Sequence, residues 1–401
     1  MTRRGTEPEA PCVVDALRTP IGTAGRGLAS LTAADLAAPV LSALVDRLPA
    51  GAGAVHEVVL GNCMGPGGDV ARVATLQAGL EPATLGWGRD VPAVTVDRQC
   101  ASGLAAVVQG AATLTATPGP GVVLAGGVES ASTAPWRFWP PGPDATASGS
   151  DAPTLQRYER APFAPAALGD PDMGVANDLL AAEAGVTRAE QDGYAARSHA
   201  RAVATAAAGG FDAELVLVGG LARDERPRDG LGVERLARLR PAFREDGTVT
   251  AGNSCGINDG AAAATLVTDD VRRSLGLPGL RIRSTATVAF DPDRPGHGLV
   301  PATRLALERA GVGLADLAVV ELNEAFAGQV LACCRALALD PERVCPEGGA
   351  LALGHPWGAS GSVLVVRLFS QLVRSGRGGL GLAAIAAGGG QGVAVVVEAV
   401  A

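Results

Sequence analysis

The feature of the sequence that most constrains the fold is an internal repeat of strand-like and helix-like segments. In the first half, EVVLGN is followed by DVARVATLQAGL, AVTVD by CASGLAAVVQGAATLTA, and then GVVLAGG. A similar succession returns near the C-terminus as AVVELNEAFAGQVLACCRAL, GASGSVLVVRLFSQL and GLAAIAAGGGQGVAVVVEA. Short apolar runs that alternate with Ala-rich helical stretches indicate a parallel-type α/β sheet. The chain is therefore expected to contain two related α/β halves.

The spacing of the matching segments supports this duplication. CASGLAAVV begins at Cys100 and matches GASGSVLVV from Gly358, an offset of 258 residues (358 − 100). Asn62 matches Asn323 at an offset of 261 residues (323 − 62). Segments rich in Ala, Gly and Val also match by chance, but three elements in the same order at nearly one offset argue against that explanation.

A segment of a different kind separates the two halves. It opens with WRFWPPGPDATASGSDAP, whose Pro and Gly residues cannot continue a helix or a strand ladder. It continues with TRAEQDGYAARSHARAVATAA, where Thr187 followed by Glu190 predicts a helix with a capping box. We therefore predict a first half over residues 1–129, an inserted loop region over 130–251 that binds substrate, and a second half over 252–401.

The charge and the cysteines exclude several classes of function. Arg accounts for all 33 positive side chains, 41 side chains are acidic, and the net charge of −8 does not suit nucleic acid or an anionic membrane as a partner. The N-terminus lacks the pattern of a secretory signal, and the sequence contains no apolar run long enough to cross a bilayer. Seven cysteines without CxxC spacing argue against a disulfide framework or a structural zinc site. We expect a cytoplasmic protein with no metal and no redox cofactor.

Cys100 is the candidate nucleophile. It follows the strand-like VPAVTVD and begins an Ala-rich helix, where unpaired backbone N–H groups and the helix dipole favour a thiolate. We therefore expect a lowered pKa for this thiol. A buried structural cysteine is the alternative, but the small neighbours Ala101, Ser102 and Gly103 favour the nucleophile.

Three further positions carry groups that such a nucleophile needs. His355, in ALGHPWGASG, should face Cys100 across the duplication and serve as its base. Asn323, in ELNEAFAG, follows a strand and could order a water or orient His355, although a helix cap is the alternative. Gly388 opens the glycine run of AAGGGQG, whose backbone N–H groups could form an oxyanion hole, although a hairpin turn also explains these glycines.

Taken together, RQCASGL, AGNSCGINDGAA, ELNEAFA, GGALALGHPWGASG and AAGGGQG resemble the thiolase family, the acyl-CoA acetyltransferases and 3-ketoacyl-CoA thiolases. The motifs occur in the family's order and span nearly the whole chain. The resemblance implies a duplicated five-layered α/β/α/β/α fold with an inserted loop domain that binds coenzyme A. It also implies a homodimer or homotetramer whose substrates are acyl-CoA thioesters, with no cofactor besides them.

The resemblance assigns a role to each matching residue. Cys100 would be acylated by an acyl-CoA, and His355 would activate its sulfur. Asn323, through a water, would join His355 in stabilising the thioester oxygen of the acyl-CoA that enters second. The backbone N–H groups of Cys100 and Gly388 would form the other oxyanion hole.

Two positions match the family's coenzyme A contacts, and one departs from its catalytic pattern. Arg228 would approach the nucleotide end of coenzyme A, and Cys255 would lie against the pantetheine, where the family usually has Ser or Ala. Ala386 stands where the family has a second cysteine, the acid/base that exchanges a proton with the α-carbon of acetyl-CoA. Losing such a group costs roughly 10²–10⁴-fold in rate, so Claisen chemistry would be impaired.

The missing cysteine leaves alternatives open. Cys100, His355 and Asn323 resemble the Cys-His-Asn set of ketoacyl synthases, so the acceptor could be a malonyl-type thioester that loses carbon dioxide, or an oxygen or nitrogen nucleophile in specialised metabolism. The chain could also be a non-catalytic subunit that binds acyl-CoA or supports an active partner. Cys63, Cys345 and Glu347 were further candidates for a substitute base.

Overall fold

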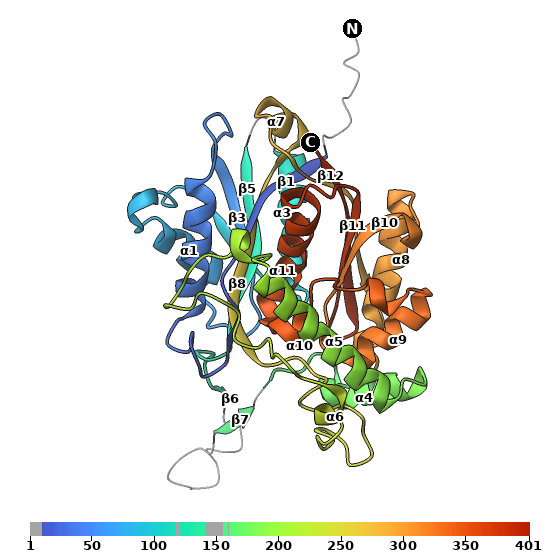
Figure 1. Ribbon diagram of the computed structural model, residues 1–401. Coiled ribbons are helices and arrows are strands. Elements are labelled where there is room, and N and C mark those ends of the chain that lie inside the picture. The colour runs from blue at the N-terminus through green and yellow to red at the C-terminus, as the bar shows by residue number, and fades with distance from the viewer. Residues whose placement is uncertain (1–9, 118–120, 141–154, 159) are drawn as a thin grey trace, which may run out of the picture.

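The strands of the first half lie in the order β4–β3–β5–β8–β1 (Figure 1). The computed structural model describes residues 10–117, 121–140, 155–158 and 160–401. β3 is parallel to β4 and β5, whereas β8 runs antiparallel to β5 and β1. The strands are β1 (Pro11–Arg18), β2 (Gly22–Thr23, paired with β8), β3 (Val55–Gly61), β4 (Ala93–Val96), β5 (Val122–Ser130) and β8 (Asn258–Thr268).

The second half repeats this order as β10–β11–β12–β9, and Val344 pairs in parallel with Val320 where β4 stands in the first half. The strands are β9 (Gly279–Ala289), β10 (Leu317–Leu322), β11 (Leu380–Ala387) and β12 (Gln391–Val400). The repeated order confirms the duplication. The prediction of a parallel-type sheet holds only for the outer strands, where β3 is parallel to β4 and β5, and β10 is parallel to β11. β12 must run antiparallel to β11 because a short turn connects them.

Helices cover both sheets and fill the space between them (Figure 1). α1 and α2 pack on the outer face of the first half, α8 and α9 on that of the second, and α3 and α11 share one apolar core with the inner faces of both. These five layers confirm the predicted α/β/α/β/α fold. The helices are α1 (Ala33–Asp46), α2 (Val70–Ala78), α3 (Ser102–Ala116), α8 (Leu299–Ala310), α9 (Ala327–Leu337) and α11 (Trp357–Phe369).

The two central helices meet through glycines at their N-terminal ends. A Cβ atom added at Gly103 of α3 would lie 2.7 Å from the Gly358 carbonyl oxygen of α11. A Cβ atom added at Gly361 would lie 2.6 Å from the Cβ of Leu104. Since a side chain would not fit at these distances, the glycines allow the N-terminal ends of α3 and α11 to come into contact. The loops that lead into α3 and α11 are thereby brought together.

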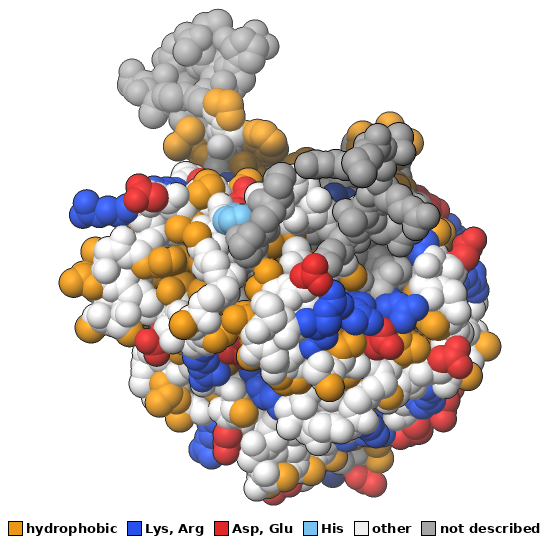
Figure 2. Space-filling view, turned by 90° about the horizontal axis from the view of Figure 1, so that it is seen from above, with side chains coloured by type: hydrophobic (Ala, Val, Ile, Leu, Met, Phe, Trp, Pro, Cys, Tyr) orange, Lys and Arg blue, Asp and Glu red, His pale blue; other side chains and the backbone are white. Residues whose placement is uncertain are grey.

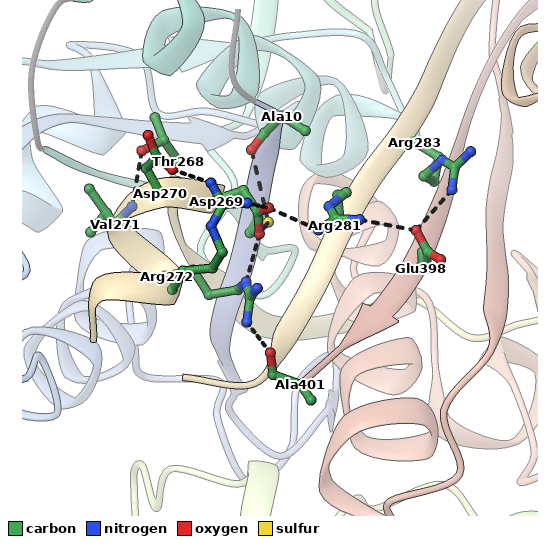
Figure 3. Close-up of polar contacts among 12 residues, drawn as sticks. Ala10, Thr268, Asp269, Asp270, Val271, Arg272, Arg281, Arg283, Glu398 and Ala401 are labelled. Carbon is green, nitrogen blue, oxygen red and sulfur yellow. Dashed lines mark hydrogen bonds and ion pairs between the residues drawn. The ribbon is translucent and has the colours of Figure 1, made fainter. Parts of the chain in front are cut away.

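A polar network spans the narrow seam between the halves. β1 and β9 pair only through Cys12 with Arg281 and Val13 with Leu280. Asp269, at the start of α7 (Asp269–Ser274), accepts a hydrogen bond from Arg281 (2.8 Å) (Figure 3). It also accepts one from the Cys12 thiol (3.3 Å). Arg281 also reaches Glu398 on β12 (Figure 3). One arginine therefore ties the two sheets to each other.

A second, fully buried ionic cluster joins β1 to α11. Arg18 bonds to Glu214 (2.7 Å) and Asp224 (2.7 Å), and Arg367 of α11 pairs with the other oxygen of Glu214. Both guanidinium groups also lie against the ring of Phe211. Buried charges are stable only when they are paired in this way, so the cluster fixes the inserted region against both halves.

The region between β5 and β8 supplies helices that pack on the second half (Figure 1). In α5, the Thr187 side chain accepts from the Glu190 N–H and the Glu190 carboxylate accepts from the Thr187 N–H, which confirms the predicted capping box. Strand pairing groups β8 with the first half, so the division proposed between residues 251 and 252 falls before that half's last strand. The elements are β6 (Arg137–Trp139), β7 (Gln156–Tyr158), α4 (Met173–Glu183), α5 (Arg188–Ala207) and α6 (Val233–Leu236).

The central part of the predicted Pro/Gly-rich loop, residues 141–154, lies outside the described residues. Within the described part of the chain, no helix combines the length and apolar character needed to cross a membrane. The same residues contain no group of three or more His, Cys, Asp or Glu side chains suited to a metal ion. On the face shown in Figure 2, arginines are interspersed with acidic and apolar side chains.

Candidate active site

Cys100 lies in the tight loop between β4 and α3. Gln99 adopts a left-handed backbone conformation (φ 49°), which turns the chain sharply before the cysteine. The Ser102 hydroxyl accepts a hydrogen bond from the Arg98 N–H (2.7 Å) and donates to the Gln99 carbonyl (2.6 Å). These bonds fix the loop, and Cys100 within it is only partly exposed.

The electrostatic environment of Cys100 differs from the sequence-based expectation. The pKa of its thiol is raised to about 12, chiefly by burial and then by the nearby Cys255 thiol, while the backbone N–H groups of Cys100 and Gly388 act to lower it. The prediction of a lowered pKa is therefore wrong for the free protein. Burial between the two halves raises the pKa of Cys100 more than the N-terminus of α3 lowers it, so Cys100 is a neutral thiol at rest.

Gly388 lies in the turn between β11 and β12. Gly389 (φ 74°) and Gly390 (φ 69°) take left-handed conformations that close this hairpin. The hairpin turn is confirmed, and the Gly388 N–H is near enough to Cys100 to lower the pKa of its thiol. Phe163, from the inserted region, covers the turn so closely that a Cβ atom at Gly388 would lie 2.5 Å from its ring. Two backbone N–H groups from opposite halves thus act to favour the thiolate of Cys100.

His355 lies two residues before α11 begins and is almost fully buried, with 2% of its surface exposed. Burial lowers its pKa to about 4, so the imidazole is neutral. Its Nδ1 lies 2.5 Å from the Ser360 hydroxyl, and that hydroxyl donates its only proton to the Pro356 carbonyl (2.9 Å). Nδ1 therefore carries the proton that Ser360 accepts. Nε2 is left unprotonated and able to act as a base.

Asn323 stands at the end of β10, where its N–H donates to the Ala384 carbonyl (3.0 Å). Its side-chain Nδ2 lies 3.4 Å from Nε2 of His355. Its Oδ1 is buried and has no hydrogen-bond partner among the described residues. Since buried polar atoms are almost always satisfied, this oxygen marks a place for a water or a ligand group. The structure thus brings Asn323 and His355 together, as predicted.

The segment around Cys255 runs between the loops that carry these two residues. The Cys255 N–H donates to the Ala325 carbonyl (2.9 Å), two residues after Asn323, and Ile257 pairs with His355 in a parallel bridge. Burial raises the pKa of Cys255 to about 12. Its thiol is near enough to Cys100 to raise that residue's pKa as well. Cys255 therefore links the nucleophile's surroundings to those of the base.

Arg228 lies on the inserted region near His199 of α5. Its backbone N–H donates to His199 Nδ1 (3.3 Å). The pKa of His199 is lowered to about 4, first by burial and then by the guanidinium groups of Arg226 and Arg228. Two cations and a neutral imidazole therefore gather beside the segment of Cys255.

Sequence reasoning missed Glu129, which joins the segment after β3 to the start of α11. Its buried carboxylate accepts hydrogen bonds from the N–H groups of Cys63 (3.2 Å), Met64 (3.1 Å) and Gly358 (3.0 Å) and from the Asn62 amide (2.9 Å). Burial is the main reason that its pKa is raised. The predicted equivalence of Asn62 and Asn323 was the available signal, because the residue opposite a catalytic position in a duplicated fold often supports it.

Ala386 lies near the end of β11, paired with Gly392. Each candidate for a substitute base makes a contact of its own, and that of Cys63 is with the residue next to Cys100. Glu347 pairs with Arg367, the Cys345 thiol donates to the Leu322 carbonyl (3.2 Å), and the Cys63 thiol donates to the Gln99 carbonyl (2.9 Å).

Models of the thiolase N-terminal domain and of the thiolase C-terminal domain match residues 12–270 and 278–399. The chain belongs to the thiolase family. It is 40% identical to an acetyl-CoA acetyltransferase of Pseudomonas aeruginosa, over 96% of this chain and 98% of the relative, and 41% identical to a beta-ketoadipyl-CoA thiolase of the same organism, over 97% and 98%. The crystal structure of the Bacillus anthracis acetyl-CoA acetyltransferase superposes with a TM-score of 0.85 at 34% identity, over 98% of this chain and 99% of that one.

Proposed function

We propose that this thiolase-type acyltransferase forms or cleaves 3-ketoacyl-CoA through an S-acyl intermediate on Cys100. The observation that carries the proposal is that the backbone N–H groups of Cys100 and Gly388, from opposite halves, both act to favour the thiolate of Cys100. A carbonyl carbon bonded to that sulfur places its oxygen within reach of the same donors. Such fixed donors stabilise the oxyanion that forms during acyl transfer.

In the proposed first step, His355 Nε2 takes the proton from Cys100 as the sulfur attacks the thioester carbonyl. The neutral His355 and the neutral thiol make this transfer concerted with attack, since neither group is charged at rest. Coenzyme A leaves as a thiol after receiving that proton. We assign Arg228 to the nucleotide end of coenzyme A and Cys255 to its pantetheine arm.

In the proposed second step, Asn323 and His355 bind the thioester oxygen of the incoming acyl-CoA. The unpartnered Oδ1 of Asn323 supports a water or ligand at this place. Carbon–carbon bond formation requires a carbanion at the α-carbon, and Ala386 cannot remove the proton that generates it. A malonyl-type acceptor is therefore the second candidate, because loss of carbon dioxide generates the carbanion at the α-carbon and no base has to remove a proton.

The test is intact-protein mass after incubation with short and medium acyl-CoA thioesters, for the wild type and Cys100→Ser, followed by acetyl-CoA or malonyl-CoA. An acyl adduct that Cys100→Ser lacks and that acetyl-CoA converts into a 3-ketoacyl-CoA supports the thiolase reaction. Discharge by malonyl-CoA alone supports the decarboxylative candidate. Absence of an adduct with every donor refutes the proposed enzyme and favours a binding or scaffold subunit.

We also propose a homodimer or homotetramer in the cytoplasm. β4 is an edge strand of the sheet, and the nearby leucines Leu76, Leu80 and Leu85 are exposed by 42%, 75% and 76%. An exposed sheet edge beside apolar side chains suits an interface between copies. All seven cysteines are free thiols, as a reducing compartment favours. Light scattering coupled to size exclusion gives the oligomeric state.

A further inference from the structure

Arg226, which the proposed reaction does not use, is a half-buried cation without an anionic partner. Its Nε atom is buried and makes no hydrogen bond to any described residue, and its guanidinium forms no ion pair with them. The neighbouring acids are engaged elsewhere. Asp224 accepts from Arg18 and Ile21, and Glu225 accepts from the N–H groups of Thr23 and Gly27.

The position of Arg226 ties it to the catalytic site. Its guanidinium lies against Gly256, where an added Cβ atom would come within 2.6 Å of Arg226 Cζ. Gly256 stands between Cys255, whose thiol influences Cys100, and Ile257, which pairs with His355. Any side chain at position 256 would push the guanidinium away. The arginine therefore lies beside a segment that contacts the surroundings of both the nucleophile and the base.

The surroundings of Arg226 are positive. Burial and the adjacent Arg228 lower its pKa, although arginine stays charged at any physiological pH. His199, held neutral beside both arginines, adds no compensating charge. An unpaired, partly desolvated guanidinium is costly to keep. A bidentate carboxylate would satisfy its planar donors and offset that cost.

We propose that Arg226 binds a carboxylate borne by the acyl part of an acyl-CoA substrate. The inference rests on the proposed function and specifies its substrate class: dicarboxylic acyl groups, as donor or as a malonyl-type acceptor, over neutral ones. Coenzyme A already has a phosphate-binding candidate in Arg228, whose side chain is exposed. Arg226 is half-buried against Gly256 and beside Cys255, whose thiol acts on Cys100, so in the proposed reaction it lies nearer the thioester than Arg228 does.

The experiment measures the second-order rate constant of Cys100 acylation for succinyl-CoA and butyryl-CoA, which share chain length and differ in charge. Arg226→Gln is expected to lower the succinyl rate about tenfold to a hundredfold, as the loss of a charged hydrogen bond implies, and to change the butyryl rate less than threefold. Arg226→Lys should recover part of the loss. Arg223→Gln is the matched control, because Arg223 is exposed on the same loop and forms no ion pair with a described residue.

Two further experiments distinguish an acyl carboxylate from a phosphate of coenzyme A as the anion that Arg226 binds. With malonyl-CoA and acetyl-CoA as second substrates, Arg226→Gln should impair only the malonyl reaction. With pantetheine thioesters, which lack the nucleotide, the succinyl preference should persist. An equal loss for both CoA donors that disappears with pantetheine would assign Arg226 to a phosphate and overturn the proposal, as would no loss at all.

Binding of the succinyl and butyryl thioesters to Cys100→Ser, followed by calorimetry, measures the preference without chemistry. A preference for the succinyl compound that Arg226→Gln abolishes supports the proposal even if acylation fails. Equal binding of the two compounds overturns it even if acylation succeeds. Failure of the anion site and failure of the proposed function are thereby distinguishable.

Discussion

The resting state of Cys100 gives a sharp prediction, because a thiol with a pKa of about 12 behaves unlike an activated one. At pH 7 such a thiol is ionised in about one molecule in 10⁵, against about 3% for a free cysteine with a pKa near 8.5. Higher intrinsic reactivity of the more basic thiolate recovers close to half of this difference on a logarithmic scale. Alkylation of Cys100 at neutral pH should therefore be about a hundredfold slower than that of a free thiol.

The assay follows iodoacetamide labelling of Cys100 by peptide mass spectrometry between pH 6 and 10, with Cys100→Ser to identify the site. The logarithm of the rate should rise by one per pH unit without a plateau, because the thiolate fraction rises tenfold. His355→Ala should leave this profile unchanged but slow acylation by an acyl-CoA about 10²–10⁴-fold, since the base acts only during transfer.

A plateau that begins near pH 7 in the wild type and disappears in His355→Ala would refute the reasoning. It would show a thiolate–imidazolium pair at rest, in which each charge stabilises the other. A plateau that persists without His355 would instead show that the N–H groups of Cys100 and Gly388 outweigh burial.

Three further predictions concern the acceptor, the base and the buried ionic cluster. Ala386→Cys should raise acetyl-CoA-dependent 3-ketoacyl-CoA formation about 10²–10⁴-fold, with Ala386→Ser unchanged; equal rates for both would contradict a missing acid/base. Ser360→Ala should slow acylation about tenfold to a hundredfold, because it removes the hydrogen-bond acceptor that keeps the proton of His355 on Nδ1. Ser360→Thr is the conservative control, and unchanged kinetics in Ser360→Ala would contradict this role. Glu214→Gln should lower the free energy of unfolding by about 3–5 kcal/mol in urea titrations. Because Arg367 and Arg18 hold the pKa of Glu214 below its ordinary value despite burial, its contribution is present at neutral pH and is lost as the pH falls through that pKa, a loss that Glu214→Gln should not show.

Much of the fold could be read from local patterns. The alternation of strand-like and helix-like segments predicted the elements, and the capping pair Thr187 and Glu190 predicted the start of α5, because both signals depend on residues close in sequence. The antiparallel placement of β8 was missed. A long insertion separates it from β5, and no local rule says on which side or in which direction such a strand returns.

The candidate site divides in the same way. Motif order pointed to Cys100, His355, Asn323 and Gly388. The structure places Nδ2 of Asn323 3.4 Å from Nε2 of His355, and the Gly388 N–H acts to lower the pKa of Cys100. The protonation of Cys100 could not be predicted, because desolvation depends on what covers the sulfur rather than on its neighbours in the chain.

The sequence by itself determined the repeated α/β pattern, the family and the chemical groups available, because each is written in residue types and spacings. Only the tertiary structure decided which groups meet. It set Glu129 between the segment after β3 and the start of α11, left Oδ1 of Asn323 without a partner among the described residues, and placed Arg226 against Gly256. The physical reason is that burial and pairing depend on surroundings, and here the surroundings come from segments that are distant in the chain, 32 residues for Asn323 and His355 and 229 for Glu129 and Gly358.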